Sequence, residues 1–205
     1  MAQPGDQPEV RVDGFVIDIV RGNRLIEIQT KHLGAMKRKL AQLLPHHPIQ
    51  LVHPIAAEKW IVRQTADGQP ISRRKSPKRG QIIDVFAELV RIPHLLPHPN
   101  LTVTVLVTQQ EEIWRDDGQG SWRRKRWSVY DHRLLDVVNQ QSFQSAEDWL
   151  ALLPGNLPQP FTNQNLAAAW NCSTNLAQKT TYTLRHAGFV QAVGKQGNAR
   201  LYQID

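Results

Sequence analysis

Two carboxylates in apolar surroundings are the most chemically suggestive residues of this 205-residue chain. Asp18 and Glu27 each have isoleucine on both sides, and Gly22-Asn23 between them is typical of a two-residue hairpin turn. That turn pairs Arg21 with Arg24, and it sets Asp18 opposite Glu27. Directly opposed residues have Cβ atoms about 4.5–5.5 Å apart. Two carboxylates repel at that distance unless a cation lies between them, and Mg²⁺ takes oxygen ligands.

Two further polar residues follow Glu27 at the period of a strand. Gln29 and Lys31 therefore share its face, so that two acids, an amide and an ammonium group line one side of the hairpin. A pair of solvated acids on an outer face is the alternative, and the spacing alone favours neither interpretation.

The elements that must position these residues follow from hydrophobic periodicity. Strands are expected over residues 10–20 and 25–29, and apolar residues at helical spacing predict a helix from Leu33 to Leu44, which Pro45 ends. A strand buried on both faces is expected over residues 49–55.

The next part of the chain predicts a second layer of elements. Short strands on either side of Asp67-Gly68 indicate a hairpin over residues 60–74. Beyond it we expect an amphipathic helix from Gln81 to Leu96, a strand from Leu101 to Val107, and an arginine-rich hairpin from Glu111 to Val138.

After Phe143 the pattern predicts a small second domain. Helices are expected after caps at Ser145, Thr162 and Thr174, and Gly188 ends the last of them in a left-handed conformation. A hairpin over residues 189–204 completes a winged helix-turn-helix. The chain is thus expected to comprise a domain of residues 1–144 and a winged domain of residues 145–205.

The charge balance favours a polyanionic partner. The chain has 25 Lys and Arg against 18 Asp and Glu, a net charge of +7. Two clusters hold much of the excess, and clusters of this kind bind phosphates, although a solvated basic face is the alternative. The phosphate-binding candidates are Arg73, Arg74, Lys75, Lys78, Arg79, Arg123, Arg124, Lys125 and Arg126.

The expected winged domain offers its own DNA-facing side chains, off the apolar stripe of its last helix. These are Asn175, Gln178, Lys179, Tyr182, Lys195 and Arg200. Because residues 145–205 carry a net charge of only +1, a packing or dimerisation module is the alternative.

Several classes of protein are disfavoured by composition. The single cysteine, Cys172, excludes internal disulfides and a CxxC zinc module. No apolar run approaches the ~18 residues of a membrane span, and the first residues do not resemble a secretion signal. We therefore expect a cytoplasmic protein with no membrane partner.

Four successive segments carry a resemblance to a known family: the run Val12–Asp18, the run Leu25–Thr30, and the basic helix and the apolar strand after them. Together they resemble the PD-(D/E)XK, or restriction-endonuclease-like, nuclease superfamily. The chain is also similar to an uncharacterised bacterial family with a C-terminal winged helix. The resemblance implies an α/β fold with a restriction-endonuclease-like mixed sheet flanked by helices. It also implies Mg²⁺ or Mn²⁺ held by Asp18, Glu27 and the Ile28 carbonyl.

The implied function is a metal-dependent DNA endonuclease. Gln29 stands where the superfamily usually has a lysine, so Gln29 would orient the attacking water, and Lys31 or a neighbouring arginine would stabilise the developing charge. Asp13 is the reserve candidate for the first acid. The alternative is a non-catalytic DNA-binding or regulatory protein that retains a degenerate nuclease fold. DNA is the expected partner rather than RNA, and a homodimer or a larger complex is a further option.

Overall fold

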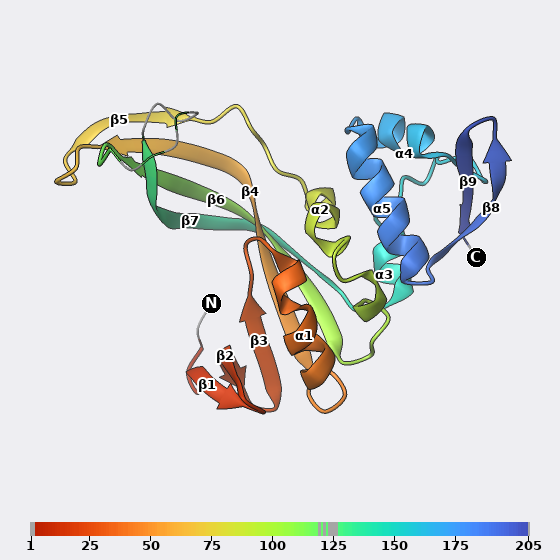
Figure 1. Cartoon of the computed structure of the whole chain (residues 1–205), viewed down its shortest axis with the longest axis horizontal. Helices are drawn as coiled ribbons and strands as arrows, with labels where there is room; N and C mark the ends of the chain where they lie inside the picture. The colour runs from red at the N-terminus through yellow and green to blue at the C-terminus, as the bar shows by residue number, and fades with distance from the viewer. Residues whose placement is uncertain (1–2, 119, 121, 123–126, 205) are drawn as a thin grey trace. The chain divides into compact units, whose positions relative to one another are not determined.

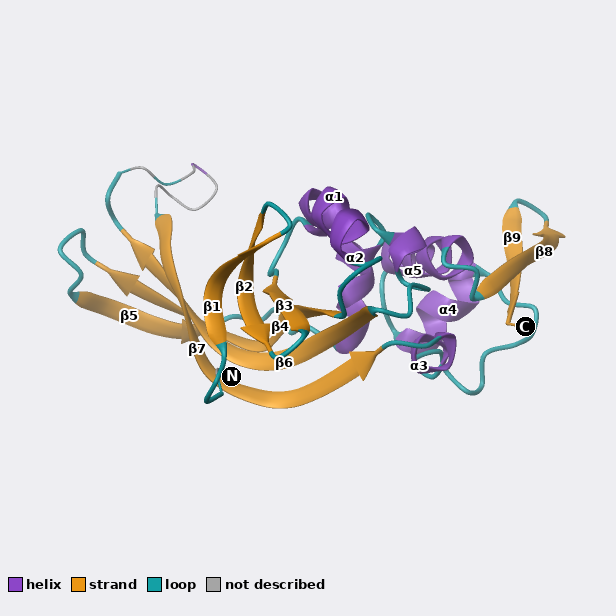
Figure 2. Ribbon diagram, turned by 90° about the horizontal axis from the view of Figure 1, so that it is seen from below, coloured by secondary structure: helices purple, strands orange, loops and turns teal. Residues whose placement is uncertain are grey.

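The computed structural model describes residues 3–118, 120, 122 and 127–204, and it contains both helices and strands (Figures 1 and 2). In these residues, strands β1 to β7 form one sheet in the order β1-β2-β3-β4-β6-β7, with β5 paired to β4, and β8 and β9 form a separate sheet. The predicted mixed α/β class is confirmed at this level.

The chain divides into two compact units. Unit 1 comprises Met1–His53, Ile83–Val105 and Gln141–Asp205, and unit 2 comprises Pro54–Ile82 and Leu106–Gln140. The expected boundary between residues 144 and 145 stays a prediction.

Unit 1 begins with three antiparallel strands, β1 (Gln7–Val12), β2 (Phe15–Arg21) and β3 (Arg24–Ile28). The single strand predicted over residues 10–20 is wrong, because the chain reverses at Asp13-Gly14, where φ is 48° and 85°. Positive φ at two successive residues is the geometry of a tight hairpin turn.

The predicted register of the second hairpin is confirmed. Across β2 and β3, Arg21 lies opposite Arg24, Val20 opposite Leu25, and Ile19 opposite Ile26. The two-residue turn at Gly22-Asn23 sets this register.

Helix α1 (Leu33–Leu43) connects β3 to the long strand β4 (Ile49–Gln64). The helix follows the sequence prediction closely, and Leu33, Leu40 and Leu43 on its apolar stripe are fully buried. Figure 2 shows α1 on one side of the strands of unit 1. Strands β3 and β4 are parallel, with Glu27 opposite Leu51.

The amphipathic helix predicted from Gln81 to Leu96 is wrong. The segment forms three short pieces: η1 (Ile82–Val85), α2 (Phe86–Leu89) and η2 (Pro93–Leu95). Pro93 disfavours a helical conformation in the residue before it, and Ile92 has φ −134° and ψ 36°. The apolar pattern still reflects burial, because Val85, Phe86 and Leu89 are fully buried.

Unit 2 is built from the second part of β4, β5 (Pro70–Lys75), the second part of β6 (Leu101–Arg115) and most of β7 (Ser128–Phe143). The hairpin around Asp67-Gly68 is confirmed, since β4 and β5 pair antiparallel with Trp60 opposite Lys75. The separate strands predicted over 49–55 and 60–63 are one continuous strand, and β6 extends well beyond the predicted end at Val107. Every residue of β5 is exposed.

The last part of unit 1 contains α3 (Ala146–Leu150), α4 (Asn163–Trp170), α5 (Thr174–His186), β8 (Val190–Gln196) and β9 (Ala199–Ile204). Ser145 and Thr162 are confirmed as N-caps, each in a capping box. The third cap is Ser173 and not Thr174, since the Ser173 hydroxyl accepts the Leu176 N–H at 3.2 Å. Gly188 has the predicted positive φ, 79°.

Aromatic side chains join this C-terminal part to the rest of unit 1. Phe143 and Trp149 are stacked with ring centroids 4.3 Å apart, and Phe86 lies 5.7 Å from Trp149. All three are almost fully buried, so they form a shared core. Among the described helices, none has the length and apolar character needed to cross a lipid bilayer.

Candidate active site

The hairpin of β2 and β3 brings Asp18 and Glu27 together one step beyond the last backbone pair, Ile19–Ile26. Asp18 is exposed, whereas Glu27 is only 4% exposed. The Asp18 carboxylate accepts the Ile28 N–H at 2.7 Å. This hydrogen bond ties the exposed acid of β2 to the backbone of β3 next to Glu27.

A lysine from α1 completes this cluster. Lys39 Nζ lies 2.5 Å from Glu27 Oε1 and also donates to the backbone carbonyl of Val16 on β2. The Lys39 side chain is 15% exposed and that of Glu27 is 5% exposed, so the ion pair is largely shielded from water.

Burial raises the pKa of Glu27 above its usual range. The ammonium group of Lys39 counteracts this rise, and the negative charge of Asp18 adds to it. Asp18 and Glu27 follow the paired residues Ile19 and Ile26 on their strands, so the two acids lie on neighbouring strands of one hairpin. The cluster therefore holds two acids and one cation whose charges are coupled.

Gln29 and Lys31 are oriented differently from the prediction. Strand β3 ends at Ile28, and the Gln29 side-chain amide donates to the Lys31 carbonyl. Lys31 is exposed, and in the described part of the chain no contact joins it to either carboxylate. The structure thus brings together Asp18, Glu27 and the Ile28 backbone, and it adds Lys39 in place of Lys31.

A buried histidine supports the end of β3. His53 on β4 lies with Nδ1 2.7 Å from the Gln29 carbonyl, and burial lowers its pKa. The Glu88 carboxylate interacts electrostatically with this ring and accepts the Leu33 N–H at 3.1 Å. His53 and Glu88 therefore connect the strand that carries Glu27 to the helix that carries Lys39.

The carboxylate pair suits a hard divalent cation. Glu27 Oε1 is buried, and among the described residues its charged partner is the Lys39 ammonium group; Asp18 adds repulsion that a second positive charge would relieve. Among the residues that the structure describes, no three acidic, histidine or cysteine side chains cluster as a metal site. Mg²⁺ is often held by one or two carboxylates plus waters and substrate phosphate, so a pair of acids is sufficient.

The first basic cluster is divided by the alternation of strand β5. Arg73 pairs with Glu111 at 2.7 Å and Lys75 pairs with Glu58 at 2.5 Å, so both cations are already neutralised. Arg74, between them, is exposed, as are Lys78 and Arg79. The second predicted cluster, Arg123, Arg124, Lys125 and Arg126, lies outside the described residues.

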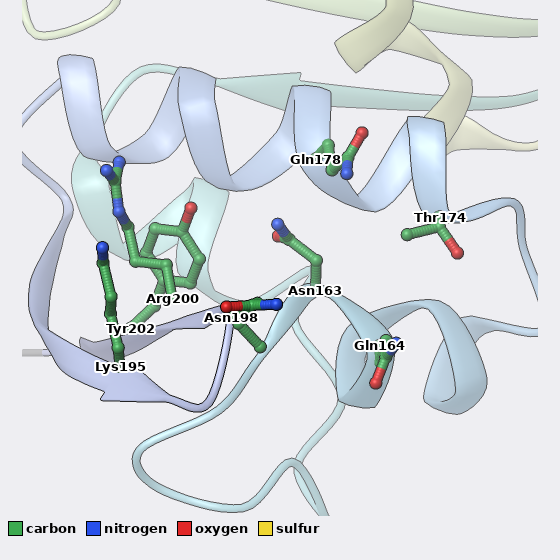
Figure 3. Close-up of a pocket in the computed structure, with 9 residues that line it drawn as sticks. Asn163, Gln164, Thr174, Gln178, Lys195, Asn198, Arg200 and Tyr202 are labelled. Atoms are coloured by element: carbon green, nitrogen blue, oxygen red, sulfur yellow. The ribbon is translucent and has the colours of Figure 1, made fainter.

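A polar cavity of about 470 Å³ lies in the C-terminal part of unit 1 (Figure 3). Three predicted DNA-facing residues line it: Gln178 on α5, Lys195 on β8 and Arg200 on β9. Lys195 and Arg200 are cross-strand partners. Asn175, Lys179 and Tyr182 are not among its lining residues, and the ring of Tyr182 lies 4.1 Å from that of His186.

The sequence patterns did not point to Lys39, or to the side-chain amides of Asn163 and Gln164 that line the cavity. The signal for Lys39 was its position at the border of the apolar stripe of α1, three residues after Met36 and four before Leu43. Asn163 and Gln164 of α4 line the cavity because the start of that helix faces the hairpin, which no local pattern indicates.

Comparison with known proteins gives a family without a described activity. Residues 1–144 match the family described as Domain of unknown function (DUF8091). An uncharacterized protein of Treponema pallidum (strain Nichols) is 30% identical over 203 residues, which cover 97% of this chain and 79% of that protein. No solved structure matches the chain at a significant level.

Proposed function

We propose that this chain, which belongs to the family described as Domain of unknown function (DUF8091), is a Mg²⁺-dependent DNA endonuclease. Asp18, Glu27 and Lys39 form its active centre. The observation that carries the proposal is the convergence of two carboxylates and one ammonium group on the β2–β3 hairpin. Metal-assisted hydrolysis of a phosphodiester uses acids that hold a cation and a positive charge that stabilises the phosphorane.

The order of elements supports a restriction-endonuclease-like core. In the superfamily that the sequence resembles, two acids face each other on neighbouring strands, and a helix and a parallel strand follow. Strands β2 and β3, helix α1 and strand β4 occur in that order, and β4 is parallel to β3.

Each residue of the centre has a distinct role. Asp18 and Glu27 hold the cation, and the Ile28 N–H orients the Asp18 carboxylate. Mg²⁺ or Mn²⁺, when bound there, would supply Lewis-acid chemistry for the hydrolysis. Lys39, oriented by the Val16 carbonyl, stabilises the charge on the phosphate and replaces the lysine that the superfamily has at the position of Gln29.

The C-terminal helices and hairpin support a winged helix-turn-helix that holds the substrate. The cavity between α4, α5 and the β8–β9 hairpin presents Lys195 and Arg200 together with side-chain amides, and such groups contact phosphates and base edges. DNA is the proposed partner, and a cytoplasmic location is part of the proposal.

A non-catalytic DNA-binding protein is the second candidate. Two contacts favour it: the ion pair that Lys39 makes with Glu27, and the hydrogen bond that holds the Gln29 amide against the Lys31 carbonyl. Both contacts would stabilise a degenerate site without any metal.

Nicking of supercoiled plasmid with and without Mg²⁺ tests the proposal. We expect Mg²⁺-dependent nicking by the wild type and none by Asp18→Asn or Glu27→Gln. Asp13→Asn is the matched control, because Asp13 lies in the β1–β2 turn and contacts His47 at 2.8 Å. An inactive wild type that still binds DNA would establish the second candidate instead.

The role of Lys39 has its own test. Lys39→Met should lower the rate about 10²–10³-fold, the cost of losing one donor that stabilises charge in the transition state. Adding Gln29→Lys to Lys39→Met should restore part of the rate, because it places an ammonium group directly after β3, two residues beyond Glu27. Unchanged nicking by Lys39→Met would exclude this residue from the centre.

A further inference from the structure

The cationic residues of unit 2 are divided between the two faces of its sheet. Unit 2 contains 13 of the Lys and Arg residues and 8 of the Asp and Glu residues, so it carries +5 of the net charge of +7. Successive residues of a strand point to opposite faces. The sequence runs of basic residues therefore do not form one surface.

On the first face, the cations are neutralised within the sheet. Arg73 and Lys75 lie over the ring of Trp60, at 4.8 and 5.2 Å, while they pair with Glu111 and Glu58. This face has matched charges and a covered aromatic ring.

On the second face, two arginines are left without an acid. Arg74 lies opposite Ile61, and Arg63 is two residues further along β4, so Arg63 and Arg74 share a face. In the described part of the chain, no ion pair involves Arg63 or Arg74, and the Arg63 Nε has no hydrogen-bond acceptor. Buried polar atoms of this kind normally have a partner.

Aromatic rings adjoin these arginines. The guanidinium carbon of Arg63 lies 5.1 Å from the ring of Trp127 and 6.0 Å from that of Trp114. One acid of this face, Glu112, is already engaged, because it accepts from Lys59 Nζ at 2.6 Å and from the Trp114 indole at 2.7 Å. Glu112 therefore does not neutralise Arg63 or Arg74.

We infer that this arginine face, formed by Arg63, Arg74, Trp114 and Trp127, binds single-stranded nucleic acid. Phosphates contact Arg63 and Arg74, and bases stack on the tryptophan rings. Sheet surfaces that combine cations with aromatic rings suit single strands, whose base faces are free, better than duplexes, whose base faces are already stacked.

The inference deepens the proposed function by naming the strand form and the surface that holds it. It rests on that function only for the class of ligand, because binding by the arginine face requires neither metal nor cleavage. It also identifies a matched pair of variants. Arg73→Gln and Arg74→Gln remove the same charge from adjacent positions, yet from opposite faces of one strand.

Fluorescence anisotropy of labelled oligothymidine in EDTA tests the inference. We use a strand of about 12 nucleotides, within the site sizes typical of sheet-based binders. Arg74→Gln should weaken binding and reduce the salt slope by about 0.7, the value for one phosphate contact on a single strand. Trp127→Leu should weaken binding about 5- to 150-fold, the range for one lost base stack. Arg73→Gln should leave affinity and slope unchanged.

The same titration with a duplex, with an RNA strand and with Arg63→Gln completes the design. A duplex should bind more weakly than the single strand, and the RNA arm identifies the sugar that the face prefers. Equal effects of Arg73→Gln and Arg74→Gln, or equal affinity for duplex and single strand, would overturn the inference. Plasmid nicking by a wild type that does not bind the single strand in EDTA would refute the arginine face alone, whereas binding without nicking would refute only the proposed endonuclease.

Discussion

Replacing Lys39 by methionine should destabilise the protein strongly, because it leaves a buried carboxylate without its counter-ion. Methionine preserves most of the aliphatic stem, so the change removes the charge rather than the packing. The Glu27 side chain is 5% exposed, and breaking a buried ion pair typically costs about 3–5 kcal/mol. For a chain of this size, such a loss corresponds to a fall in Tm of about 6–20 °C.

The loss of stability caused by Lys39→Met should depend on pH in a defined direction. Burial already raises the pKa of Glu27, and loss of Lys39 raises it further. A raised carboxyl pKa means that the folded state binds the proton more tightly than the unfolded state does. Stability is then highest below the ordinary pKa of about 4.3 and is lost as the pH rises through the folded pKa. The deficit of Lys39→Met should therefore be smaller at pH 5 than at pH 8.

Urea denaturation at both pH values measures this effect. The double variant Glu27→Gln with Lys39→Met should recover at least about 2 kcal/mol of the loss, because a neutral amide is cheaper to bury than an unpaired carboxylate. A deficit below about 1 kcal/mol for Lys39→Met, or strict additivity of the two substitutions, would refute the view that the pair is buried and coupled.

Two other predictions concern unit 1 and unit 2 separately. Wild-type stability should fall as the pH drops below about 6.5, because burial lowers the pKa of His53 and the unfolded chain takes up the proton first. Thermal melts measure this dependence of stability on pH, and it should be weaker in His53→Gln. In unit 2, Gly80→Ala should cost about 1–3 kcal/mol in calorimetry, since its Cβ would lie 2.5 Å from Ile55 Cγ2 and 2.7 Å from the Ala56 carbonyl oxygen. Gly34→Ala is the control: its Cβ meets Arg91 at 3.5 Å, and it should be neutral or stabilising by up to about 1 kcal/mol.

The sequence by itself determined the features that depend on neighbouring residues. The Gly22-Asn23 turn set the β2–β3 register, since a two-residue turn leaves one choice of opposed pairs. The caps at Ser145 and Thr162 and the left-handed Gly188 were likewise predictable, because each satisfies backbone groups within four residues.

Only the tertiary structure decided which cation meets Glu27. Lys31 and Lys39 were both basic residues downstream of the acid, and the nearer one was the natural expectation. Packing of the α1 stripe instead brings Lys39 to the β2–β3 hairpin, while β3 ends before Lys31. The position of Lys39 beside the apolar stripe shows only that it lies near the buried face of the helix. The acid that it meets depends on how the whole apolar face of α1 packs, which is a sum over distant contacts.

The same reason explains the basic cluster on β5. In the sequence, Arg73, Arg74 and Lys75 are one run of positive charge. In the folded sheet, strand alternation separates them, and acids from β4 and β6 neutralise Arg73 and Lys75 but not Arg74. The acids beside a strand belong to the neighbouring strands of the sheet. These strands come from distant parts of the sequence, so a local sequence pattern does not show which acids will meet the basic residues.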